Sequence, residues 1–134
     1  MKKVLLFLFC GALAAHTILW VDTPSVQAIK PFKEQFEAQY VKPDSTDPTE
    51  QLFAEAVATA KCNVCHVGKS KKNRNAYGRQ LAELLDRLAD KGNPDKIRAA
   101  LDKVAGMKSA PDNPDAPTFG ELIKSGKLPG GESE

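Results

Sequence analysis

The sequence contains few of the residues that bind metals or cofactors, and this scarcity limits the sites the chain can form. Its 134 residues include three cysteines, two histidines, two methionines and one tryptophan. No second Cys-x-x-Cys pair is present to complete the four ligands of a structural zinc site. The formal net charge is only +2, without the excess of basic residues typical of nucleic-acid-binding domains. We therefore expect no nucleic-acid partner.

The long apolar run of the chain lies at its amino terminus. Lys2 and Lys3 precede the run Val4–Ala15, and a small-residue pattern ends at Ala28. This arrangement is typical of a secretory signal peptide. It predicts a signal peptide over residues 1–28, cleavage after Ala28 and a periplasmic or otherwise exported protein.

Two other interpretations of the amino terminus stay open. Ala12-Leu13-Ala14 offers an earlier cleavage site, and an uncleaved anchor extending to Val21 would include His16, which makes it less apolar. Cys10 follows the bulky Phe9, which argues against lipoprotein cleavage. We expect contact with a membrane only through this segment, if it is retained.

Removal of residues 1–28 leaves 106 residues, a length that suits one small domain. This mature chain carries 17 basic and 16 acidic side chains, because Lys2, Lys3 and Asp22 are removed. It retains two cysteines, one histidine and one methionine: Cys62, Cys65, His66 and Met107. A site with two histidine ligands from one chain is therefore excluded.

The pentapeptide Cys62-Asn63-Val64-Cys65-His66 is typical of the covalent attachment site of c-type haem. Its spacing puts the two thiols on neighbouring turns, where they can form thioethers with the two vinyl groups of one porphyrin. His66 would then be the proximal ligand of the iron. The sequence thus predicts one covalent haem c.

Other interpretations of the two thiols fit less well. A redox dithiol of the thioredoxin kind follows a strand, and no strand pattern precedes Cys62. For zinc, Cys62, Cys65 and His66 are too crowded to act together. Haem is attached to such apoproteins outside the cytoplasmic membrane, so the export signal independently agrees with the haem interpretation.

The hydrophobic periodicity is helical wherever it is clear. It predicts helices over residues 49–62, from 77 to 92, from 94 to a stop near Gly106, and briefly from Thr118 to Gly126. Asn93 and Pro94 have the pattern of a helix start, and Thr118 with Glu121 has the spacing of a capping box. The sequence therefore predicts an all-α domain.

The remaining segments are predicted from composition. Phe32, Phe36 and Tyr40 lie four residues apart and predict a short helix or an aromatic arm, with core packing favoured over partner binding. Residues 42–49 are typical of a linker, and 69–75 and 108–117 of loops. We expect the tail, residues 129–134, to be disordered.

With its motif and helices, the chain resembles class I cytochromes c over most of residues 49–128. The shared features are a helix before the motif, histidine directly after it, helices downstream and a terminal helix. The resemblance implies a small helical domain around one covalently bound haem, in residues 49–128. Residues 29–48 would form an amino-terminal arm and linker.

The resemblance also implies a methionine as distal ligand of the iron. Met107 lies 41 residues beyond His66 and follows Gly106, but Lys108 stands where proline often follows the methionine, and the last predicted helix is short. Met107 also continues by one step of three the apolar stripe of the preceding helix, which ends at Val104. Both axial ligation and a place in the core therefore stay open.

Two classes of function follow. With Met107 on the iron, the protein would be an exported one-electron carrier and no enzyme. With an open distal face, it would bind a small gas or act like a peroxidase, with Tyr77, Arg74 or Arg79 replacing a distal histidine. A haem subunit of a larger respiratory complex is a further alternative.

Basic residues are concentrated around the motif. Between Lys61 and Arg79 the chain has six basic residues and no acidic one. We call them the basic cluster: Lys61, Lys69, Lys71, Lys72, Arg74 and Arg79. They predict either a docking surface for an acidic redox partner or a solvated loop.

Overall fold

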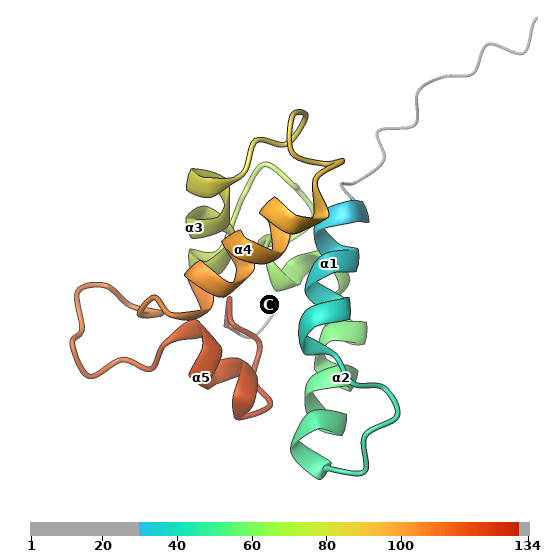
Figure 1. The fold of residues 1–134 in the computed structure, drawn as a ribbon. Helices are drawn as coiled ribbons and strands as arrows, with labels where there is room; N and C mark the ends of the chain where they lie inside the picture. Colours follow the sequence, from blue (N-terminus) through green and yellow to red (C-terminus); the bar gives the residue numbers. More distant parts are fainter. Residues whose placement is uncertain (1–29, 132–134) are drawn as a thin grey trace, which may run out of the picture.

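The structure, a computed structural model, describes residues 30–131 and is all-α in this range (Figure 1). Its elements are α1 (Lys30–Tyr40), α2 (Pro48–Ala60), the 3₁₀ segment η1 (Lys61–Val64), α3 (Ala76–Leu84), α4 (Pro94–Ala105) and α5 (Phe119–Lys124). The described part has no strand, only two isolated bridges. The all-α prediction is confirmed. The predicted signal peptide and its cleavage site lie outside the described residues.

Three helices begin at side-chain caps, of which those of α4 and α5 were predicted. Asp47 caps α2, with its carboxylate accepting hydrogen bonds from the next two free backbone N–H groups, and Pro48 follows at the first helical position. Asn93 caps α4 in the same way. Thr118 and Glu121 form the predicted capping box of α5. Side-chain caps thus determine where these three helices begin.

Helix α3 ends at Leu84, earlier than the predicted stop at Gly92. The backbone of the next residues bonds to side chains instead: Asp86 accepts from the N–H groups of Leu88 and Ala89 at 2.8 and 2.7 Å. Asp90, 6% exposed, accepts from Asp86 N at 2.7 Å. Such local bonds compete with a helix, so the apolar spacing alone overestimates its length.

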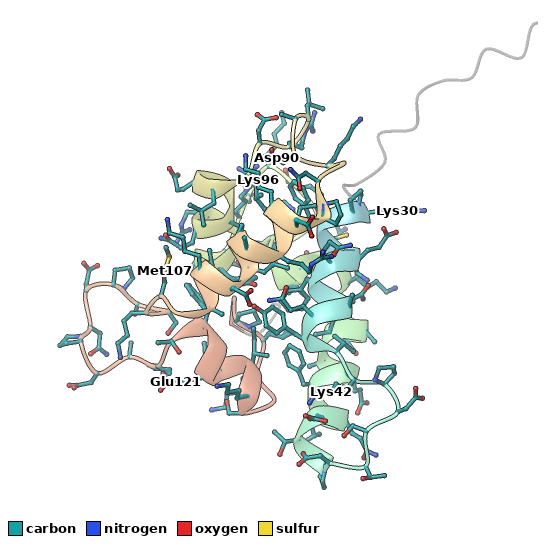
Figure 2. The ribbon with its side chains drawn as sticks, in the orientation of Figure 1. Lys30, Lys42, Asp90, Lys96, Met107 and Glu121 are labelled. Atoms are coloured by element: carbon teal, nitrogen blue, oxygen red, sulfur yellow. The ribbon has the colours of Figure 1, made fainter. Side chains whose placement is uncertain are left out.

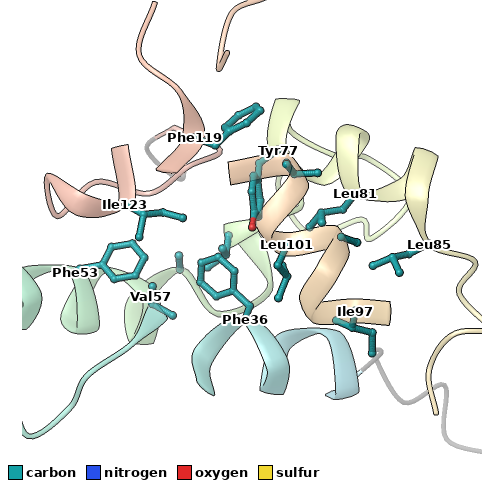
Figure 3. Close-up of a cluster of buried hydrophobic side chains, with 14 residues drawn as sticks. Phe36, Phe53, Val57, Tyr77, Leu81, Leu85, Ile97, Leu101, Phe119 and Ile123 are labelled. Atoms are coloured by element: carbon teal, nitrogen blue, oxygen red, sulfur yellow. The ribbon is translucent and has the colours of Figure 1, made fainter. Parts of the chain in front are cut away.

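Helix α4 lies at the centre of the fold and packs against α1, α3 and α5, while α2 packs against α5 (Figure 1). Aromatic rings fill the space between these helices (Figure 3). The ring centroids of Phe36 and Tyr77 are 5.9 Å apart, and those of Tyr77 and Phe119 are 5.2 Å apart. Edge-on pairs of this kind contribute more stability than is expected from the apolar area they bury.

The segment before α2 belongs to this core. Phe36 in α1 is 2% exposed, and Phe32 and Tyr40 pack against the same cluster. The prediction that these aromatic residues serve the core is confirmed, and the segment is a helix. Residues on both sides of the predicted boundary at residue 48 therefore pack in one core. The linker between α1 and α2 is the loop 41–47.

The carboxyl-terminal residues are ordered further than predicted. Pro129 is buried, and Leu128 packs against the core. At Gly130 a Cβ would come within 1.9 Å of Asn75 Nδ2, so this backbone lies directly against the Asn75 side chain. The prediction of disorder is wrong for residues 129–131, because composition did not show this tertiary contact. Residues 132–134 lie outside the described range.

Candidate haem-attachment site

The motif lies directly after α2, in η1 and the turn that follows. Lys61 has φ +52°, the one positive φ of a non-glycine residue in the described range, and it turns the chain from α2 into η1. The backbone N–H groups of Cys65 and His66 both donate to Cys62 O, at 3.3 and 3.1 Å. Both thiols are free and partly buried. A tight turn therefore carries Cys62, Cys65 and His66.

One ring nitrogen of His66 has a backbone partner. Nδ1 lies 3.2 Å from Asn73 O. Because a carbonyl oxygen can only accept, Nδ1 carries the hydrogen and donates it, which leaves the lone pair on Nε2. Burial lowers the pKa of His66, and the charges of Lys71 and Arg74 lower it further, against the opposing effect of the Asn73 bond. The neutral imidazole is the form that binds a metal.

The thiol of Cys65 differs from that of a redox dithiol. Burial raises the pKa of Cys65 to about 12, and the nearby Cys62 contributes in the same direction. Dithiol oxidoreductases depend instead on a thiol whose pKa is lowered. Cys65 therefore lacks the activated thiol of a dithiol oxidoreductase.

The donor set fits a haem c. Attachment needs two free thiols and a neutral imidazole with an available nitrogen. Cys62 and Cys65 supply the thiols, and His66 supplies the imidazole. An open cavity of about 400 Å³ is lined by Cys62 and Asn63 of the motif. Of the three attachment residues only Cys62 lines this cavity, while Cys65 and His66 are held in the turn by backbone bonds to Cys62 O.

Three members of the basic cluster line this cavity: Lys61, Lys69 and Lys71. Lys71 Nζ donates to Asn63 Oδ1 at 3.1 Å, and the Arg79 guanidinium donates to Arg74 O at 3.2 Å. None of the six cations takes part in the ion pairs of residues 30–131. Their charge around Cys62 is therefore not neutralised by acidic side chains there.

Met107 lies two residues beyond the carboxyl-terminal end of α4 (Figure 2). Its side chain is partly buried and packs against the core, and its carbonyl accepts from Phe119 N at 3.0 Å. The structure therefore places the Met107 side chain against the core, and its ligation of the iron stays a prediction.

Tyr77, proposed from the sequence as a substitute distal residue, lies in the core. Its side chain is fully buried, and its hydroxyl has no hydrogen-bond partner. Burial raises its pKa, so the hydroxyl stays protonated. Arg74 and Arg79 lie on the segment that follows the motif, where Arg74 pairs with His66 in a backbone bridge.

The residues that hold the motif in place were not predicted from the sequence. The sequence predicts only a loop over 69–75, yet Asn73 supplies the acceptor for His66 and Asn75 caps α3 by accepting from Gly78 N. A signal for Asn75 was available, since asparagine just before an apolar helical stripe is a preferred cap. Asn73 has no such signal, because its role depends on a backbone oxygen.

No family model, curated protein or solved structure matches this chain. No group of three or more His, Cys, Asp or Glu side chains in the described part is arranged to hold a metal ion. None of the described helices combines the length and apolar character needed to span a bilayer.

Proposed function

We propose that this protein is an exported one-electron carrier with one covalent haem c, in a small helical domain of the class I cytochrome c kind. The observation that carries the proposal is the turn Cys62-Asn63-Val64-Cys65-His66 with His66 Nδ1 donating to Asn73 O. That bond leaves Nε2, the nitrogen at the far side of the ring, for the iron.

Each residue of the site has a separate role. Cys62 and Cys65 hold the group covalently, and His66 is the proximal ligand. When bound, the haem supplies a one-electron iron couple. Asn73 fixes the tautomer of the imidazole, and the buried side chains behind the turn exclude water. Electron transfer requires no substrate pocket.

The helical arrangement supports the class I proposal. Helix α2 runs directly into the motif, α3 and α4 follow it, and α5 packs against α2. In class I cytochromes c the terminal helix likewise packs across the first. Helix α5 has only six residues, so this contact is small.

A second candidate is a five-coordinate haem protein that binds a small gas or acts like a peroxidase. It is favoured by one observation: the Met107 side chain packs against the core. A haem subunit of a larger respiratory complex would use the same attachment residues.

Replacement of Met107 distinguishes these candidates. If Met107 is the distal ligand, we expect Met107→Ala to change a low-spin optical spectrum to high-spin and to lower the reduction potential, because a thioether favours ferrous iron. Val104→Ala, which truncates a fully buried side chain one turn earlier, is the control and should leave the spin state unchanged. An unchanged spectrum in Met107→Ala would favour the five-coordinate candidate.

The basic cluster predicts how a partner approaches. We expect electron transfer to an acidic partner to slow steeply with salt, as the Debye length falls to about 8 Å at physiological ionic strength and about 3 Å at 1 M. Charge reversal at Lys71 and Lys72 should slow it more than reversal at Lys124 and Lys127, as measured by stopped-flow association rates. Equal effects from the two pairs, or rates indifferent to salt, would mean that the cluster is a solvated loop.

A further inference from the structure

Three consecutive carbonyl groups of the motif bond to a single residue. The side-chain amide of Asn75 donates to Asn63 O at 3.2 Å and to Val64 O at 3.0 Å. Its backbone N–H donates to Cys65 O at 3.2 Å. Asn75 is 8% exposed, so these bonds are protected from water.

These bonds exceed what a helix cap needs. As the cap of α3, Asn75 accepts from Gly78 N at 2.9 Å through its side-chain oxygen and from Arg79 N at 3.0 Å through its backbone carbonyl. The two hydrogens of its amide are free for other acceptors, and both reach the motif. Aspartate, which caps equally well, could not make these two bonds.

Neighbouring glycines bring the backbone close enough for this arrangement. A Cβ at Gly78 would lie 2.0 Å from Cys65 O, so α3 begins directly against the motif. A Cβ at Gly130 would lie 1.9 Å from Asn75 Nδ2, so the carboxyl-terminal segment covers the amide from the other side. Asn75 is therefore enclosed between the motif, α3 and residues 128–131.

We propose that Asn75 is a positioning residue for haem attachment, which holds the turn bearing Cys62, Cys65 and His66 in one arrangement. This inference rests on the proposed covalent haem. It extends the site to a residue ten positions after Cys65 and to the carboxyl-terminal segment that packs on it. The bound group would inherit its orientation from the turn, because the thioethers and His66 are all attached there.

The test compares Asn75→Asp with Asn93→Asp in the full chain, exported from a host that attaches haem c. Both variants keep a side-chain oxygen for the helix cap, and only Asn75→Asp removes the bonds to Asn63 O and Val64 O. We expect haem per chain, measured by intact mass, to fall roughly tenfold in Asn75→Asp, the effect of two lost hydrogen bonds on the ordered turn. The ferric electron paramagnetic resonance of the loaded fraction should change from one signal to several. Asn93→Asp should match the wild type in both measurements.

A second pair covers the case in which Asn75→Asp does not accumulate. Gly130→Ala places a methyl group against the Asn75 amide, whereas a Cβ at Gly92 meets nothing within 4 Å. We expect lower haem content and heterogeneous resonance in Gly130→Ala, and neither in Gly92→Ala. If the wild type carries haem and both test variants match their controls, the inference is overturned alone. A wild type without covalent haem overturns the proposed function and this inference together.

Discussion

Replacement of both Cys62 and Cys65 by serine is expected to abolish covalent haem completely. A thioether survives denaturation, whereas a haem held only by His66 would dissociate from the unfolded chain. Denaturing electrophoresis with a haem stain should therefore show a band for the wild type and none for the double variant.

Cys10→Ser is the matched control for this experiment. Cys10 is the third cysteine of the chain and lies in the predicted signal peptide, so its replacement should leave the stained band unchanged. A stained band in the double variant would contradict the account. So would haem that acid acetone extracts from the correctly matured wild type.

The second large effect is expected from Gly78→Ala. The added Cβ would lie 2.0 Å from the carbonyl oxygen of Cys65 and 2.9 Å from its carbon, and these backbone atoms cannot rotate away. Helix α3 would have to move off the motif and lose the bond from Asn75 N to Cys65 O. Overpacking of this kind lowers the free energy of unfolding by about 3 kcal/mol, which lowers the thermal unfolding midpoint of a domain this size by roughly 10–20 °C.

Gly92→Ala provides the comparison, because its Cβ would occupy open space. At this exposed position we expect the free energy of unfolding to change by no more than about 0.5 kcal/mol. Thermal unfolding of the two purified variants, followed by circular dichroism, measures the difference. Equal unfolding midpoints for the two variants would contradict the close contact between Gly78 of α3 and the Cys65 carbonyl.

The elements predicted best from the sequence are those determined by local chemistry. The caps at Asn93 and Thr118 each act on a backbone N–H three residues away, so the sequence contains both partners of each bond. The end of α3 was predicted too late because an apolar stripe does not reveal the competing bonds of Asp86 and Asp90. The apolar side chain of Leu88 is 66% exposed despite its place in that stripe.

Tertiary contacts account for what could not be predicted. Phe36 reaches the core from a segment whose composition also suited a loose arm, and Gly130 lies against a side chain more than fifty positions earlier. In the site, the motif residues were evident from their spacing alone. Asn73 acts through its backbone oxygen, which any residue type supplies, so no side-chain pattern identifies it. Asn75 is recognisable as a helix cap, but its bonds to Asn63 O and Val64 O are not, because those acceptors are backbone oxygens.

The most direct test of the covalent haem is intact mass spectrometry of the exported wild-type protein in denaturant. It measures what stays bound when all non-covalent contacts are lost, and it gives the cleavage site from the same spectrum. We expect a single species whose mass exceeds that of the processed chain by one haem. The mass of the bare polypeptide, from a host that attaches haem c to other proteins, would contradict it.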